Sequence, residues 1–185
     1  MADKVTMKRS WCLGAGLMAV ATAGCSMAPA GAMLPSAVRP FYRPLRIQVA
    51  EDRNIVRRVS LEQYVQATII SEFAPASGEP DLVGRMLEVQ AVIGRTYAIA
   101  NVGRHARQGF DLCSTTHCQL YEPSRLRTSR WAPAAKAAAA RTAGAVLWHD
   151  HRPVIALFHA DCGGHTNTAM NAWRGTPRAY LSAVP

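Results

Sequence analysis

The stretch VSLEQYVQATIISEF, residues 59–73, constrains the fold more than any other segment of the chain. Ser60 followed by Gln63 is a capping box, in which each side chain satisfies a free backbone N–H at the start of a helix. Apolar residues then recur at helical spacing, which predicts a buried face made of Leu61, Tyr64, Val65, Thr68 and Ile69. Glu72 follows Leu61 by about three turns, so it falls on nearly the same face. A carboxylate on the buried side of a helix end is a candidate functional group.

Short strands and helices are expected on both sides of this helix. Residues 45–50 (LRIQVA) alternate in polarity and predict a strand, with residues 55–60 (IVRRVS) as its partner. A longer helix is expected over about 81–102. Its predicted apolar stripe consists of Leu82, Met86, Val89, Ile93, Tyr97 and Ala100.

The second half of the chain also mixes helices and strands. Residues 134–140 predict an alanine-rich helix closed by Gly144. Residues 145–160 predict a hairpin that turns at Asp150-His151. This order favours an α+β fold over a doubly wound sheet. We expect a single mixed domain of short strands and several helices with a substrate cleft.

The N-terminus has the composition of a secretory signal peptide. A basic start is followed by a short apolar run at residues 11–24 and a small-residue exit. The exit TAGC resembles a lipobox, in which Cys25 becomes the lipidated first residue. Ala30-Gly31-Ala32 is a rival exit that would release a soluble protein.

These features predict a signal peptide at 1–24, a Pro/Ala/Gly-rich linker at 25–44 and one folded domain at 45–185. We therefore expect an exported protein, a membrane-anchored lipoprotein facing the periplasm or the cell wall.

The net charge of the chain is +9, from 21 basic and 12 acidic residues. Removal of residues 1–24 takes away three basic residues and one acidic residue, which leaves +7. An exported protein meets little nucleic acid, so we expect no nucleic-acid partner; an anionic envelope polymer or lipid headgroups suit the charge better. A merely solubilising surface charge explains the same numbers.

Glu72 is the leading catalytic candidate. Its neighbours Ile69, Ile70 and Phe73 would remove water from the carboxyl group, and desolvation favours the protonated form. A carboxylic acid that keeps its proton near neutral pH can act as a general acid on a glycosidic bond. The alternative is a helix-terminal glutamate that turns to solvent or pairs with an arginine.

The segment DLCSTTHCQLYEP, residues 111–123, contains two cysteines in a spacing that is weak for zinc. Nitrogen ligands could come from His105, His117 or His165. Export favours oxidation, so a disulfide among Cys113, Cys118 and Cys162 is the alternative. A Cys162–His165 nucleophile pair is poorly placed in a Gly-Gly loop.

Five segments together resemble the SpoIID/LytB family, which is named for stage II sporulation protein D and the amidase enhancer LytB. They follow the family order and cover nearly the whole domain: residues 59–73, LEVQAVIGRTYAIAN (87–101), 111–123, 139–173 and RAYLSAV (178–184). The combination of the helix ending in Glu, the Q-A-V-x-x-R-T-Y helix and the C-x-T-T-H-C-Q-x-Y loop carries the resemblance.

The resemblance implies a peptidoglycan lytic transglycosylase that acts on glycan strands without stem peptides. Glu72 would protonate the oxygen between N-acetylmuramic acid and N-acetylglucosamine, and then help the C6 hydroxyl to close a 1,6-anhydro ring. An internal nucleophile needs one carboxylate, where hydrolysis normally needs two.

The resemblance also implies further site residues. A zinc ion, acting as a structural staple, would be held by His105, Cys113 and Cys118, with an open position. Substrate contacts are expected from Arg95, Thr96, Tyr97, His117, Gln119, Tyr121, Gly163, Gly164 and Thr166.

A rival hypothesis is a non-catalytic glycan-binding module that recruits or stimulates a cell-wall amidase. Arg178-Ala179-Tyr180-Leu181 stands where Pro-Tyr-Leu is usual, and many relatives continue beyond Pro185, which favours the module slightly. A zinc amidase using the Cys/His loop is a weaker third hypothesis, because thiolate-rich zinc sites are usually structural.

Overall fold

The computed structural model describes residues 5–8, 43–50, 52, 55–73, 75, 77–159, 163–174 and 177–185. Cys25, the candidate lipidation site, and Cys162 lie outside these residues, as do most of the expected signal peptide and linker.

The first sheet contains three short strands in the order β3-β2-β4. Strands β2 (Leu45–Gln48) and β3 (Val56–Val59) pair antiparallel, which confirms the predicted strand pair. Strand β4 (Leu112–Cys113) pairs with β2 in parallel and places Cys113 opposite Gln48. Strand β4 could not be predicted from the sequence, because a two-residue strand has no period to detect.

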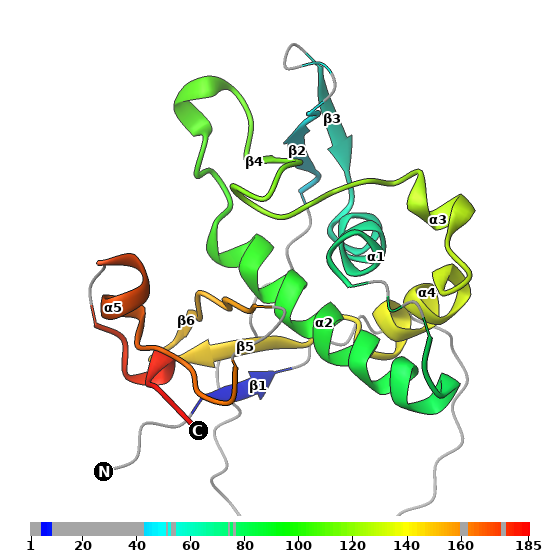
Figure 1. The fold of residues 1–185 in the computed structure, drawn as a ribbon. Coiled ribbons are helices and arrows are strands. Elements are labelled where there is room, and N and C mark those ends of the chain that lie inside the picture. The colour runs from blue at the N-terminus through cyan, green and yellow to red at the C-terminus, as the bar shows by residue number, and fades with distance from the viewer. Residues whose placement is uncertain are drawn as a thin grey trace, which may run out of the picture.

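Three helices pack against one another beside this sheet (Figure 1). Helix α1 (Leu61–Glu72) begins with the predicted capping box, since the Ser60 hydroxyl accepts from the Gln63 N–H and the Gln63 side chain accepts from the Ser60 N–H. Helices α2 (Pro80–Ala100) and α4 (Ala132–Arg141) complete the group. Their shared core consists of Val65, Ile69, Ile70, Val83, Leu87, Ala91, Ala135, Ala138 and Ala139. Each large aliphatic side chain buried there contributes about 1.5–3 kcal/mol.

The predicted apolar stripe of α2 was wrong at its N-terminal half. Leu82, Met86 and Val89 are 49%, 43% and 59% exposed. The helix instead buries Val83, Leu87 and Gln90, each of which follows a member of the predicted stripe by one position. Each residue turns an α-helix by about 100°, so a pattern that is out of phase by one residue selects the wrong face.

The second sheet has the order β1-β5-β6. Strands β5 (Val146–His149) and β6 (Arg152–Pro153) form the predicted hairpin. Asp150 and His151 have φ of 46° and 60°, and a tight hairpin turn requires positive φ at both central positions. Strand β1 (Thr6–Lys8) pairs antiparallel with the other edge of β5.

The remaining elements are short. They are α3 (Arg125–Thr128), α5 (Ala169–Trp173) and two 3₁₀ turns at Ala106–Gln108 and Ala179–Leu181. The helices and the two small sheets confirm the α+β class. Within the described part of the chain, no helix has the length and apolar character needed to cross a bilayer.

Candidate active site and candidate metal centre

Glu72 is the last residue of α1, and its carboxyl group is half-buried. The helix ends there because Phe73 adopts an extended conformation. The N–H of Leu120 donates to Glu72 Oε1 at 2.5 Å. Burial raises the pKa of Glu72, and the Leu120 N–H only partly opposes this shift because it stabilises the charged form. The site therefore favours a carboxyl group that holds its proton at higher pH than an exposed glutamate.

The loop that contacts Glu72 is fixed to α1 by two further hydrogen bonds. Ser71 Oγ accepts from the N–H of Glu122 at 2.9 Å. The Tyr64 hydroxyl donates to Gln119 Oε1 at 3.1 Å, and the Tyr64 ring stacks on Tyr121 with centroids 5.3 Å apart. Residues 119–122 are thus held in register with the last three turns of α1, which positions the Leu120 N–H against the carboxylate.

A cavity of about 430 Å³ opens in front of Glu72. We call it the Glu72 cavity. Its walls come from the ends of α1 and α2, from the loop of residues 111–123 (the cysteine loop) and from the segment after β6. The lining residues are Glu72, Tyr97, Arg104, Thr116, His117, Cys118, Gln119, Ala156, Leu157 and Phe158. Glu72 is the one carboxylate among these described residues. The loop of residues 111–123 therefore forms one rim of the cavity.

Arg104 lines the cavity and was not identified from the sequence. Its Nη1 donates to the Tyr97 hydroxyl at 3.1 Å, and the side chain is otherwise exposed. No arginine or lysine of the described residues forms an ion pair with Glu72. The cavity therefore places an acid and a separate cation on the same surface.

Gln119 is buried to 2% exposure and faces the same cavity. Its Oε1 accepts from Tyr64, while its Nε2 has no partner within the described part of the chain. A buried N–H without an acceptor is costly. The Nε2 atom is itself buried and lies close to Gly94 of α2, so it is an unsatisfied donor inside the fold and not an exposed contact.

Arg95 does not occupy the predicted substrate position. It is fully buried, and its guanidinium donates to both oxygens of Glu62 at 2.8 and 2.7 Å. It also donates to the carbonyl oxygens of Ala139, in α4, and of Ala145, immediately before β5. Arg95 thus joins α1, α2, α4 and the start of β5, and it does not line the Glu72 cavity.

Thr96 also has a structural position in place of the predicted substrate contact. It is fully buried. Its hydroxyl donates to the Val92 carbonyl and accepts from the Leu147 N–H at 3.0 Å, which fixes β5 against α2. Helical spacing alone cannot show which way this side of α2 faces, and the contacts with α4 and β5 show that it faces the interior.

The other predicted substrate residues are divided among several places. Tyr97, His117 and Gln119 line the Glu72 cavity. Tyr121 lines a different cavity. Thr166 lines a third one, which shares Leu157 and Phe158 with the Glu72 cavity.

Gly163 and Gly164 do not line the Glu72 cavity. Both have positive φ, at 62° and 93°, a conformation that glycine adopts without strain. Their predicted role in substrate binding has no support in the cavity lining.

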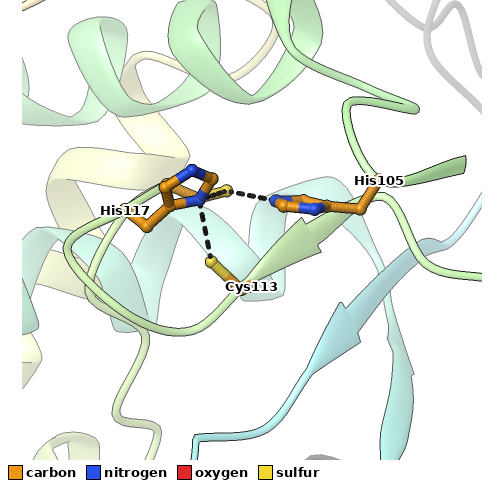
Figure 2. Close-up of side chains that lie close together, drawn as sticks. His105, Cys113 and His117 are labelled. Atoms are coloured by element: carbon orange, nitrogen blue, oxygen red, sulfur yellow. Dashed lines mark hydrogen bonds between the residues drawn. The ribbon is translucent and has the colours of Figure 1, made fainter. Parts of the chain in front are cut away.

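Two cysteines and two histidines converge beside the Glu72 cavity (Figure 2). Cys118 Sγ lies 3.4 Å from His105 Nε2 and 3.7 Å from His117 Nδ1, and Cys113 Sγ lies 3.6 Å from His117 Nδ1. The ligand atoms of all four residues lie within 4.8 Å of one another. This cluster could hold a metal ion, and it adds His117 to the three predicted ligands.

The surroundings hold these side chains in place. His105 Nδ1 contacts Gln108 Oε1 at 2.5 Å, and its ring stacks on Phe110. Hydrogen bonding to the other ring nitrogen is the usual way in which a metal-binding histidine is oriented. Cys113 and Cys118 are both free and buried in the structure, so they do not form the alternative disulfide with each other.

The two thiols are electrostatically different. Burial raises the pKa of Cys118 to about 11. Burial acts in the same direction on Cys113, but hydrogen bonds from Thr115 and Cys118 outweigh it and lower the pKa of Cys113. A bound metal ion would stabilise both thiolates.

Asp111 anchors the start of the cysteine loop and was not recognised from the sequence. Arg43 donates to both of its carboxylate oxygens at 2.9 Å, and the Arg46 N–H donates to Oδ2. Burial would raise the pKa of Asp111, but the hydrogen bonds from Arg43 and Arg46 lower it well below its usual value. The carboxylate stays charged and holds β4 beside β2.

A comparison of the amino-acid sequence with known proteins finds a family match. Residues 50–149, more than half of the chain, match the SpoIID family, described as stage II sporulation protein. An uncharacterised protein of Brachyspira hyodysenteriae is 30% identical over 131 residues, which are 70% of this chain and 33% of that protein. Stage II sporulation protein D of Bacillus amyloliquefaciens is 26% identical over 153 residues, 76% of this chain and 43% of that protein. The chain thus spans less than half the length of these curated relatives.

Proposed function

The chain belongs to the SpoIID family, and we propose that it is a lytic transglycosylase that cleaves peptidoglycan strands free of stem peptides. The family match confirms the resemblance found in the sequence. The observation that carries the proposal is Glu72: a half-buried carboxyl group with a raised pKa, alone among carboxylates in the described lining of its cavity.

Glu72 acts first as the general acid. Its proton goes to the oxygen that links C1 of N-acetylmuramic acid to N-acetylglucosamine, and the bond from C1 to that oxygen breaks. The N-acetylglucosamine leaves as an alcohol, and positive charge develops at C1. A raised pKa keeps the proton on Glu72 until this step.

Glu72 then acts as the base. The C6 hydroxyl of the same muramic acid attacks C1, and its proton goes to the Glu72 carboxylate, which restores the starting acid. Because the nucleophile is part of the substrate, no second carboxylate is needed to activate water. The lining of the Glu72 cavity supports this scheme, since it contains one carboxylate among the described residues.

Arg104 supports a preference for strands without stem peptides. Such strands expose the lactyl carboxylate of each muramic acid. The exposed guanidinium of Arg104 lines the Glu72 cavity and can pair with that carboxylate. A stem peptide would replace the carboxylate with an amide and remove the ion pair.

The Cys/His cluster suits zinc as a structural staple. A tetrahedral zinc with bonds of about 2.3 Å to sulfur and about 2.05 Å to nitrogen separates the two ligand atoms by about 3.6 Å. The observed sulfur–nitrogen separations are 3.4, 3.6 and 3.7 Å. His105, Cys113, His117 and Cys118 would fill all four positions, which leaves none for a reacting water and favours a structural role.

We further propose an envelope location. The basic, apolar and small-residue order of the leader supports export, and Cys25 offers a site for a lipid anchor. Peptidoglycan strands are then the macromolecular partner, with a cell-wall amidase as a second one.

Mass spectrometry of the products tests the proposed reaction. The full chain and its Glu72→Gln variant are incubated with denuded strands and with strands that keep their stem peptides. We expect new 1,6-anhydro ends from denuded strands with the parent chain and none with the variant. Bound but uncut strands with the parent chain would contradict the reaction and identify a glycan-binding module instead.

A further inference from the structure

A second cavity lies next to the loop of residues 119–122, whose Leu120 N–H donates to Glu72. It measures about 290 Å³ and is formed by the β2–β3 turn region, the loop before α3, and α3 itself. We call it the Tyr121 pocket; its lining is Val49, Asp52, Ile55, Arg57, Tyr121, Glu122, Pro123, Ser124 and Arg127. None of these residues lines the Glu72 cavity.

Two arginine side chains line the Tyr121 pocket and have no bonding partner among the described residues. The guanidinium groups of Arg57 and Arg127 make no hydrogen bond or ion pair with another described residue, and both side chains are exposed. Two carboxylates also line the pocket. Glu122 is paired with Arg125, and Asp52 belongs to the turn between β2 and β3. The two guanidinium groups can therefore receive an anion from outside.

The pocket wall combines these cations with an aromatic ring. Tyr121 is 8% exposed and stacks on Tyr64 through one face. Val49, Ile55 and Pro123 add apolar surface near it. An apolar wall suits the apolar face of a sugar, and planar guanidinium groups suit a carboxylate.

The 119–122 loop connects the pocket with the reacting centre. Gln119 faces the Glu72 cavity, Leu120 donates to Glu72, and Tyr121 faces the Tyr121 pocket. A glycan strand that crosses this loop would therefore meet Glu72 between two binding surfaces.

We propose that the Tyr121 pocket is a second glycan subsite, in which Arg57 and Arg127 bind the lactyl carboxylate of a muramic acid remote from the bond that is cut. This inference rests on the proposed function for the identity of the polymer. Binding energy from a remote sugar can hold the scissile bond against the acid. The subsite would extend the preference for denuded strands beyond the residues around Glu72.

Binding to uncut strands tests this subsite. The full chain carrying Glu72→Gln is titrated with fluorescently labelled denuded strands, with and without Arg57→Gln, Arg127→Gln and both together. Arg85→Gln is the matched control, because Arg85 is an exposed arginine of α2 that lines none of the described cavities. We expect the double variant to bind roughly tenfold more weakly, the change that 1.4 kcal/mol gives, and the control to bind unchanged.

Strands whose lactyl carboxylates have been reduced to alcohols identify the group that is bound. We expect the background chain to lose affinity for reduced strands, and the double variant to lose much less on reduction. Equal Kd values for the double variant and Arg85→Gln would overturn the subsite. So would a double variant that loses as much affinity on reduction as the background chain does.

Failure of the subsite and failure of the proposed reaction give different results. If the chain with native Glu72 forms no anhydro ends but its binding still depends on Arg57 and Arg127, the reaction fails and the subsite stands. If anhydro ends form and the double variant binds normally, the subsite alone fails. Unfolding midpoints of the variants confirm that each chain is folded before it is titrated.

Discussion

The two ends of α1 each present a glutamate, and the structure uses them in opposite ways. Glu62, in the first turn, gives both carboxylate oxygens to the fully buried guanidinium of Arg95. Glu72, in the last turn, accepts one backbone N–H from Leu120 and faces a cavity. One carboxylate neutralises a buried charge and the other is left free to exchange a proton.

This difference shows that partners, rather than residue type, decide the role of a carboxylate. Arg95 Nη2 lies 2.7 Å from Glu62 Oε2, so the Glu62 carboxylate serves as the acceptor for a buried cation. Partial burial without a cation favours the protonated form of Glu72, which can donate. We expect the two glutamates to respond differently to the same substitution.

The largest expected effect is on turnover. Glu72→Gln should lower the rate of bond cleavage by about 100- to 10,000-fold, the usual contribution of a general acid. The amide can still accept from the Leu120 N–H, so the fold should be retained. Formation of anhydro ends over time, with circular dichroism as a check on folding, measures both. A Glu72→Gln chain that turns over like the parent would remove Glu72 from the mechanism.

Loss of the metal centre should have the largest effect on stability. Cys118→Ser removes one of four clustered ligands, and loss of a structural metal is among the changes that cost more than about 4 kcal/mol. Metal analysis should find one zinc per parent chain and much less in the variant, together with a lower unfolding midpoint. His165→Ala is the control, since His165 is not part of the cluster. Equal midpoints for the parent and Cys118→Ser would argue against a stabilising metal.

Glu62→Gln should reduce stability by about 3 kcal/mol, because it leaves the charge of Arg95 buried without a counter-ion. Denaturant unfolding measures this change. Glu88→Gln is a matched control, because Glu88 pairs with Arg141 at the surface and such pairs contribute at most about 1 kcal/mol. Similar losses from the two substitutions would mean that the buried pair is no more important than the exposed one.

The smallest expected effect is the pH dependence of stability at Glu72. The pKa of Glu72 is raised on folding, so the folded chain holds this proton more tightly than the unfolded chain. The stability that this proton contributes is present at low pH and is lost as the pH rises through the folded pKa. Glu72→Gln should therefore gain stability relative to the parent as the pH rises.

Unfolding midpoints of Glu72→Gln and the parent, measured across the acid range, test this sign. A difference between the two chains that stays constant with pH would mean that the pKa of Glu72 is not raised on folding.

The helix that carries both glutamates could be predicted from the sequence because its signals are local. The capping box at Ser60 and Gln63 sets its start, and the apolar period placed Glu72 near the buried face. The hairpin turn at Asp150 and His151 is equally local. The expected desolvation of Glu72 is also found in the structure, where burial raises the pKa of this carboxyl group.

Features that depend on contacts between distant segments could not be predicted. Arg95 lies in an apolar helix, and only the position of Glu62 and of the end of α4 shows that it is a structural cation. Arg104 enters the site because α2 ends beside the cysteine loop. The parallel pairing of β4 with β2 joins segments more than sixty residues apart and has no local pattern.

We propose that a single carboxylate, Glu72, cleaves the strand through an internal nucleophile. The most direct test is to incubate the full chain with denuded strands in water labelled with heavy oxygen, and to measure the mass of the new muramic acid ends. We expect anhydro ends that carry no label and that are absent with Glu72→Gln. Labelled reducing ends would contradict it, because they would show that water, and not the C6 hydroxyl, attacks C1.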